Sequence, residues 1–105
     1  MADDVVVAPA TAADVDAIDA ISRHSFRTPW PRQTFVDELA RPHGRLVVAR
    51  VGAAGPIVGY VNYWLVADEV HLLAIAVQPD HRRGGVGARL LDHVLAVAAG
   101  ARLIT

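Results

Sequence analysis

The sequence contains no cysteine and no lysine, and only 6% of its 105 residues are aromatic. The absence of cysteine excludes a disulfide framework and a thiol nucleophile, and it fits a cytoplasmic protein. Charges or glycines interrupt every apolar run before it reaches the length of a membrane span, so we expect no membrane partner. The opening MADDVVVAPA is acidic and has no basic region, so we expect no secretory signal there.

The residues that are present are typical of one small globular domain. Hydrophobic residues make up 53% of the chain and the mean hydropathy is +0.32. We therefore expect residues 1–105 to form a single domain with its own core. The net charge of −1 argues against general nucleic-acid binding, although Arg82 and Arg83 form a local basic spot.

Hydrophobic periodicity and turn residues predict the order of the elements. The expected elements are a strand over 5–8, helices over 12–24 and 32–40, strands over 46–51, 57–66 and 69–77, a helix that follows Gly87 and ends at Gly100, and the opening of a strand over 102–105. Two details are specific enough to test. Strand 69–77 should alternate regularly, with Glu69, His71, Leu73, Ile75 and Val77 on one face. The last helix should carry an apolar face of Leu90, Leu91, Val94, Leu95 and Ala98.

The segment 72–95 contains the pattern that is most informative about function. An apolar strand enters a Pro-Asp turn, a loop with two arginines and three glycines follows, and a helix then begins. Loop amides, the positive end of the helix dipole and glycines that admit close approach together form a cradle for an anion such as a phosphate. A Walker A loop is excluded because Ala88 and Arg89 follow the last glycine, and a Rossmann fingerprint lacks its parallel β-α-β context.

The residues of this segment match a known signature. RRGGVGA over 82–88 fits the acetyl-CoA motif Arg/Gln-x-x-Gly-x-Gly/Ala, with Arg82, Gly85 and Gly87 in the defining places. The run-in over 75–79, Ile-Ala-Val-x-Pro, and the order of the elements fit as well. The chain therefore resembles the GNAT acetyltransferase superfamily. Pro29-Trp30, Phe35, Glu38-Leu39, Val58-Gly59-Tyr60 and Asp68-Glu69 make it most similar to the ribosomal-protein-alanine N-acetyltransferases of the RimI type.

The resemblance implies an α+β fold with a mostly antiparallel sheet flanked by helices. It also implies acetyl-CoA as co-substrate and a protein or peptide N-terminal α-amine as acceptor. The backbone of Ile75, Ala76 and Val77 would bind the pantetheine arm, and one N–H there would polarise the thioester carbonyl. The pyrophosphate would be held by Arg82, Arg83, Gly84, Gly85, Val86, Gly87 and Ala88.

Such enzymes continue past a position like Leu103 into a strand, a helix and a hairpin that bear the usual general base and general acid. We therefore expect the chain to be the first part of such a domain, ending at the start of the fifth strand. Within it, Glu69 and His71 share the polar end of a strand and are our candidates for removing a proton from the acceptor amine, the alternative being two solvent-facing side chains.

Aromatic residues are our candidates for the acceptor site. Trp30 lies between two prolines in a loop, and Tyr60 and Tyr63 lie on a strand, so each is expected to wall a substrate groove, while Phe35 fits the core equally well. The histidines show no metal-ligand spacing, so we expect no metal site.

Two other functions stay open. The chain is alternatively an acyl-CoA-binding or interaction module without turnover, or a GNAT acting on a small-molecule amine. An unpaired sheet edge near Leu103 and Ile104 would further promote self-association.

Overall fold

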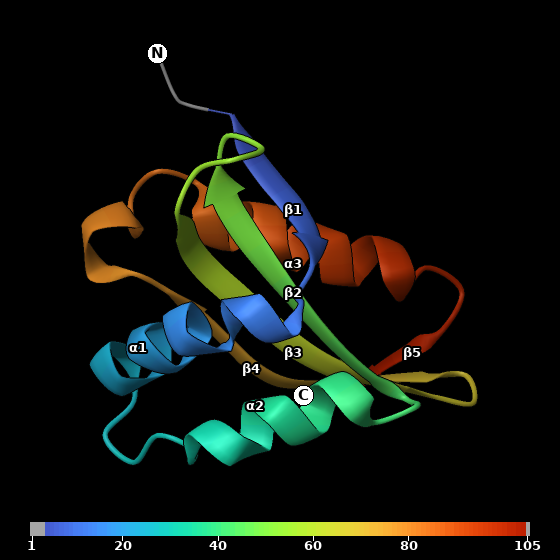
Figure 1. Ribbon diagram of the computed structural model, residues 1–105. Coiled ribbons are helices and arrows are strands. Elements are labelled where there is room, and N and C mark those ends of the chain that lie inside the picture. Colours follow the sequence, from blue (N-terminus) through green and yellow to red (C-terminus); the bar gives the residue numbers. More distant parts are fainter. Residues whose placement is uncertain (1–3, 105) are drawn as a thin grey trace.

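The fold is a five-stranded sheet with helices on both faces (Figure 1). The computed structural model describes residues 4–104. The strands follow the chain across the sheet in the order β1-β2-β3-β4-β5. Their bounds are β1 Val5–Pro9, β2 Gly44–Val51, β3 Ile57–Val66, β4 Glu69–Val77 and β5 Arg102–Ile104. Each neighbouring pair is antiparallel except β4 and β5, which are parallel. The expected α+β fold with a mostly antiparallel sheet is confirmed.

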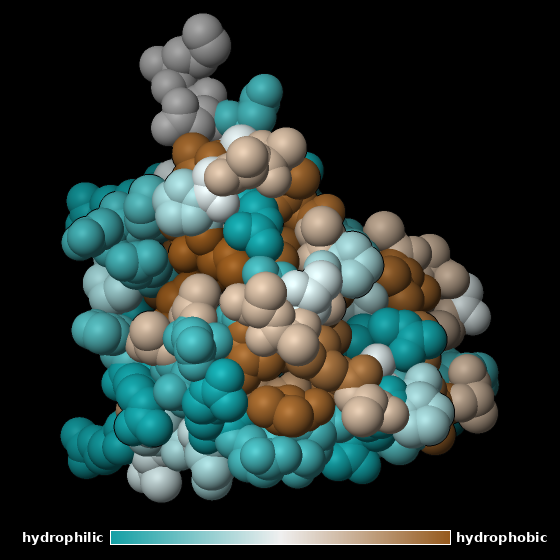
Figure 2. All heavy atoms as spheres, viewed as in Figure 1, coloured by the Kyte–Doolittle hydropathy of each residue, from teal (hydrophilic) through white to brown (hydrophobic). Residues whose placement is uncertain are grey.

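Two apolar cores form, one on each face of the sheet. Within the described part of the chain the α-helices are α1 Val15–Ser25, α2 Arg32–Ala40 and α3 Val86–Val97, and the 3-10 turns are η1 Ala12–Asp14 and η2 Pro79–His81. One core joins α1 and α2 to the sheet, and the other joins α3 to the opposite face. Figure 2 shows hydrophilic side chains over α1 and α2, with hydrophobic atoms reaching the surface between them.

The first helix departs slightly from its expected form. Residues 12–14 are a 3-10 turn, and the α-helix proper starts at Val15. The Thr11 amide donates to the Asp14 carboxylate at 2.8 Å, which fixes the tight first turn. At the far end Ser22 is buried, because it continues the stripe begun by Ile18.

Strand β4 does not alternate as expected. Asn62 pairs with Ala74 but its neighbour Tyr63 pairs with Leu72, so Leu73 is an extra residue in β4. This bulge reverses the phase of the strand. Val70 and Leu72 face α3 before it, and Ile75 and Val77 face α3 after it, whereas the regular pattern placed these pairs on opposite faces.

Helix α3 packs unusually close to β3. A Cβ at Gly59 would meet the Ala76 carbonyl oxygen at 3.1 Å and the side chains of Val86 and Leu90 at 3.0 and 3.1 Å. The buried stripe of α3 is Val86, Leu90 and Val94, whereas Leu91 and Leu95 of the expected apolar face are 40% and 48% exposed. The expected apolar face was wider than the buried one, because a helix that lies on a sheet buries only a narrow stripe of its side chains.

A buried carboxylate fixes α2 on the sheet. Glu38 is 4% exposed and accepts hydrogen bonds from Asn62 Nδ2 at 2.9 Å, Trp64 Nε1 at 2.8 Å and Arg41 Nε at 2.7 Å. Burial by itself would raise the pKa of Glu38, but these hydrogen bonds outweigh it and lower the pKa below its usual value. The carboxylate is therefore ionised and holds the end of α2 against β3.

Candidate active site

The loop between β4 and α3 presents unpaired backbone amides. Gly85 caps α3 with φ of 82°, a left-handed conformation that favours glycine. Its carbonyl oxygen accepts the Arg89 amide at 3.0 Å. Within residues 4–104, the amides of 85–88 donate no backbone hydrogen bond. These amides and the helix dipole create a site for an anion at the start of α3.

At two positions of this segment, neither the backbone conformation nor the available space requires glycine. Neither Gly84 nor Gly87 has a positive φ. A Cβ at Gly87 would make an ordinary contact of 3.6 Å with Val77, and one at Gly84 would lie 3.7 Å from the His81 carbonyl oxygen. Folding therefore tolerates side chains at both positions. Their absence keeps the backbone accessible, and this is the feature that a bound diphosphate requires.

The two arginines of the loop are arranged differently. Arg82 donates through Nε to the Val77 carbonyl oxygen at 3.0 Å and through Nη2 to Ser25 Oγ at 3.3 Å, which ties the loop to β4 and to the end of α1. Arg83 is exposed, and no hydrogen bond from its side chain is found in the described chain. Val86 is 2% exposed and belongs to the core, and Ala88 is exposed, so both offer only backbone groups to a ligand.

The final part of β4 lines a cavity of about 340 Å³ beside the loop. Its walls are Ser25, Phe26, Ile75, Ala76, Val77, Arg82 and Gly87. Strand β5 pairs only with residues 69–71 of β4, so over residues 72–77 no described strand lies on that side of β4. Backbone groups on this edge are free to bind an extended amide-bearing chain, as an added strand would.

A second cavity, of about 240 Å³, adjoins the first at Phe26. Its walls are Ser22, Phe26, Thr28, Pro29, Trp30, Tyr60, Leu73 and Ala74. The Trp30 and Phe35 ring centroids lie 5.7 Å apart, and those of Phe35 and Tyr60 lie 5.5 Å apart. Phe35 is fully buried and supports the two aromatic walls from the core.

Tyr60 contributes an unusual hydroxyl to this region. The side chain is fully buried, and within the described chain its hydroxyl completes no hydrogen bond. Burial raises the pKa of Tyr60, the neighbouring Ser22 hydroxyl opposes this, and the charge of Asp19 adds to it. The hydroxyl is therefore neutral at ordinary pH. An unpaired buried hydroxyl is costly unless a partner binds it.

Tyr63 lies elsewhere. It is on the α3 face of the sheet, where its hydroxyl is 2.8 Å from His93 Nε2. The structure thus brings Trp30 and Tyr60 together and separates Tyr63 from them. Tyr60 and Tyr63 are three positions apart on one strand, and side chains an odd number of positions apart point to opposite faces of a sheet. This spacing is the sequence signal that could have separated the two tyrosines.

Glu69 and His71 form a pair at the beginning of β4. His71 Nε2 lies 2.8 Å from Glu69 Oε1, and the Arg102 guanidinium forms an ion pair with Glu69, with Nη2 3.3 Å from Oε2. Because a carboxylate accepts the hydrogen bond, Nε2 carries the proton and Nδ1 of a neutral ring is the free acceptor. The pair is half-buried and lines none of the cavities described above.

Several site residues could not be predicted from the sequence. Ser22, Ser25 and Phe26 reach the cavities only because α1 crosses over β4, and the bulge at Leu73 left no signal in an apolar run. Among residues 4–104, no three His, Cys, Asp or Glu side chains are grouped as metal ligands. No helix among these residues is long and apolar enough to span a bilayer.

The chain is similar to known acetyltransferases. Residues 15–105 match the family model described as acetyltransferase (GNAT) family. A putative ribosomal protein bS18-alanine N-acetyltransferase of Bacillus subtilis is 31% identical over 78 residues, which are 73% of this chain and 50% of the relative. The N-alpha-acetyltransferase RimI of Mycobacterium tuberculosis is 40% identical over 78 residues, or 69% of this chain and 47% of the relative.

Solved structures agree on the fold. The ribosomal-protein-S18-alanine N-acetyltransferase from Escherichia coli superposes with a TM-score of 0.79 at 24% identity, covering 90% of this chain and 59% of that one. The chain spans about half the length of the curated relatives that it matches. The family model covers most of the chain. The chain belongs to the GNAT acetyltransferase family.

Proposed function

We propose that this chain supplies the coenzyme site and part of the acceptor site of an enzyme that transfers an acetyl group from acetyl-CoA to the N-terminal α-amine of a polypeptide. One observation carries the proposal. The cavity beside the free edge of β4 adjoins the aromatic cavity at Phe26, so a ligand extended along β4 would end next to Trp30 and Tyr60. The similarity to N-terminal acetyltransferases supports the choice of acceptor.

The coenzyme would be held mainly by backbone. The amides of residues 85–88 would bind the pyrophosphate, with Arg83 adding charge, and the free edge of residues 75–77 would bind the pantetheine arm. When bound, acetyl-CoA supplies a thioester: the amine nitrogen bonds to the acetyl carbon, the carbon–sulfur bond breaks, and the sulfur leaves and takes up a proton. A β4 amide directed at the acetyl oxygen would stabilise the charge that develops there.

The acceptor cavity suits a peptide end better than a highly charged molecule. None of the residues that line it carries a formal charge, and Phe26 and Leu73 at its walls are 39% and 37% exposed. A polycationic small molecule would require acidic walls, whereas a peptide terminus can use apolar contact and the unpaired Tyr60 hydroxyl. This distinction favours the peptide acceptor over a small-molecule amine.

The amine must lose a proton before it attacks. An α-ammonium group has a pKa of about 8, so a modest base suffices. We assign this task to His71, with Glu69 orienting the ring so that Nδ1 accepts the proton. His71 precedes Leu73 by two residues, or about 7 Å along the strand, so the transfer would pass through a water molecule.

The test is a calorimetric titration of the 105-residue chain with acetyl-CoA, with ATP as a control. Saturable binding should be followed by thiol release with an alanine-initiated peptide, but not with the same peptide acetylated at its N-terminus. His71→Ala should lower thiol release and leave coenzyme binding intact, whereas His43→Ala should change neither.

The outcomes separate the two classes of function. Failure of the folded chain to bind acetyl-CoA would refute the coenzyme site. Binding without thiol release from any peptide would instead identify an acyl-CoA-binding module without turnover.

A further inference from the structure

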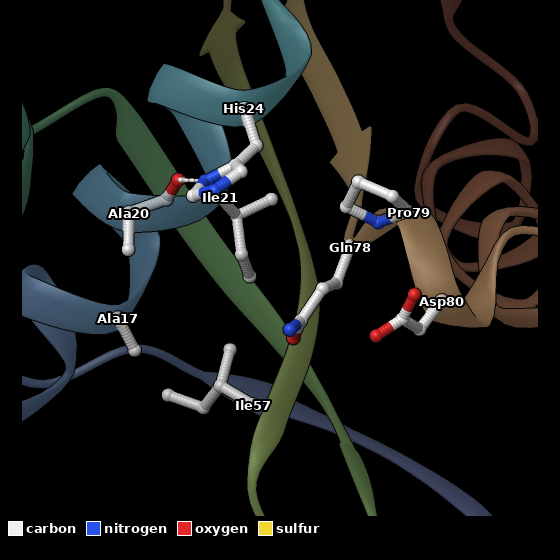
Figure 3. A pocket seen from close by; sticks show the side chains of 8 residues that line it. All are labelled: Ala17, Ala20, Ile21, His24, Ile57, Gln78, Pro79 and Asp80. Carbon is white, nitrogen blue, oxygen red and sulfur yellow. Dashed lines mark hydrogen bonds between the residues drawn. The ribbon is translucent and has the colours of Figure 1, made fainter.

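A separate cavity of about 430 Å³ lies between α1 and η2 (Figure 3). None of its lining residues lines the coenzyme or acceptor cavities. The stripe Ala17, Ala20, Ile21 and His24 of α1 forms one wall, and Gln78 and Asp80 lie opposite. Of its lining residues only Gln78 and Pro79 belong to the run-in that precedes the glycine-rich loop, and the function proposed above leaves the cavity unused.

The floor of this cavity is apolar. Ile21 is 4% exposed and Ile57 is 9% exposed, and the two alanines beside them leave room above the helix. In Figure 3 the Gln78 side chain extends across the cavity toward Ile57, and the Asp80 carboxylate is turned toward the same space. A ligand here would place a hydrocarbon portion on the floor and polar atoms at the rim.

The polar groups of the rim all offer acceptors. His24 Nδ1 lies 2.8 Å from the Ala20 carbonyl oxygen, and a carbonyl only accepts, so Nδ1 carries the proton. Nε2 of the neutral ring is then an acceptor, as are the Asp80 carboxylate and the amide oxygen of Gln78. These three acceptors together favour a ligand that is rich in donors.

The rim also carries an uncompensated negative charge. In residues 4–104, Asp80 forms no ion pair within 4 Å. Arg23, which adjoins His24 on α1, pairs with Asp19 at 3.0 Å, and Arg82 donates to the Val77 carbonyl and to Ser25. Arg83 is three residues from Asp80 along the chain but forms no ion pair with it in the described residues. A cation bound beside Asp80 would meet a free carboxylate.

We propose that this cavity binds an alkylguanidinium group. The aliphatic stem would lie on Ala17, Ala20 and Ile57, and the planar guanidinium would donate two hydrogen bonds to Asp80 and others to Gln78 or His24. An ammonium group, a compact and strongly hydrated charge, matches this flat apolar site less well. The group could come from a small guanidine compound or from an arginine of a polypeptide, and the experiment separates these sources. The inference does not rest on the proposed acetyltransferase activity.

The test is an amide chemical-shift titration of the full chain with agmatine and with acetyl-Gly-Arg-Gly-amide. We expect saturable shifts at Ala17, Ala20 and Ile57 with at least one of the two. Agmatine alone would identify a small-molecule ligand, and the peptide alone would identify a polypeptide ligand. The matching lysine peptide should bind more weakly.

Variants make the result specific. Asp80→Asn should weaken binding by about fivefold or more, because it removes the charge that pairs with guanidinium. Asp92→Asn removes the same charge from the exposed side of α3 and should leave the affinity unchanged. No saturable shift with either guanidinium compound, equal binding of the lysine peptide, or unchanged affinity in a folded Asp80→Asn chain would each overturn the proposal.

Discussion

Replacing Gly87 by aspartate should separate stability from coenzyme binding. Gly87 is the second residue of α3, its φ is not positive, and a Cβ there meets only Val77 at an ordinary 3.6 Å. A residue other than glycine favours the helix by a few tenths of a kcal/mol up to about 1 kcal/mol, and a negative charge in the first turn adds about 0.3–1 kcal/mol. The variant should therefore unfold at the same temperature as the parent chain or a higher one.

Coenzyme binding should change in the opposite direction. Gly87 lines the cavity beside the unpaired amides, so the new carboxylate would lie next to the bound pyrophosphate. Like charges about 4 Å apart repel by about 1 kcal/mol in water and about 4 kcal/mol near a protein surface, so acetyl-CoA affinity should fall by about tenfold or more.

The assay pairs thermal unfolding with calorimetric titration, and Gly87→Asn is the matched control. Asparagine has the size of aspartate without its charge, so it should bind acetyl-CoA better than the aspartate variant. Equal affinity in the parent and aspartate chains would refute the anion site. Equal loss in both variants would show that bulk, rather than charge, excludes the coenzyme.

Four further predictions follow from the packing and the polar groups. Gly59→Ala should lower the free energy of unfolding, measured in urea, by about 1–3 kcal/mol, because the new Cβ would meet the Ala76 carbonyl oxygen at 3.1 Å. An unchanged urea midpoint of unfolding would contradict the close approach of α3. Because the pKa of Glu38 is lowered, its carboxylate contributes to stability above pH 4.5, and this contribution is lost as the pH falls through the lower folded-state pKa. Urea unfolding at a series of pH values should therefore show a smaller loss of stability in acid for Glu38→Gln than for the parent chain. Equal losses in the two chains would disprove this. Tyr60→Phe should keep or raise the stability of the fold, because it removes an unpaired buried hydroxyl. The same variant should lower kcat/KM for a peptide acceptor, and unchanged kinetics would show that the Tyr60 hydroxyl does not contact the acceptor. The 37% exposed Leu103 on β5 predicts self-association, and light scattering that shows only monomer at micromolar concentration would exclude it.

Much of the fold could be predicted because its signals are local. The expected bounds of α2, β3 and β4 agree with the structure, since prolines, glycines or an Ala-Asp turn adjoin each of them. The glycine-rich loop before α3 could be predicted for the same reason, because a continuous run of residues builds it. The bulge at Leu73 was not, because two adjacent leucines fit either face of a strand.

The acceptor cavity shows the limit more clearly. Ser22, Trp30, Tyr60 and Leu73 come from four separate segments, and only tertiary packing brings them together. Trp30 and Tyr60 were among the expected residues because aromatic side chains are conspicuous, whereas Ser22 had no such mark. Tyr63 was expected in the acceptor groove for the same reason, but its side chain lies on the other face of the sheet.

The extra residue in β4 has a consequence for how such a site can diversify. Before Leu73 the strand pairs with β5 and carries Glu69 and His71, and after it the strand has the free edge that we propose binds the coenzyme. In the function proposed above, a single strand thus contains two units joined by a one-residue step in register. Substitutions in the first unit can alter how an acceptor is handled while the second continues to bind the same coenzyme. One side of the reaction can therefore vary while the other stays constant.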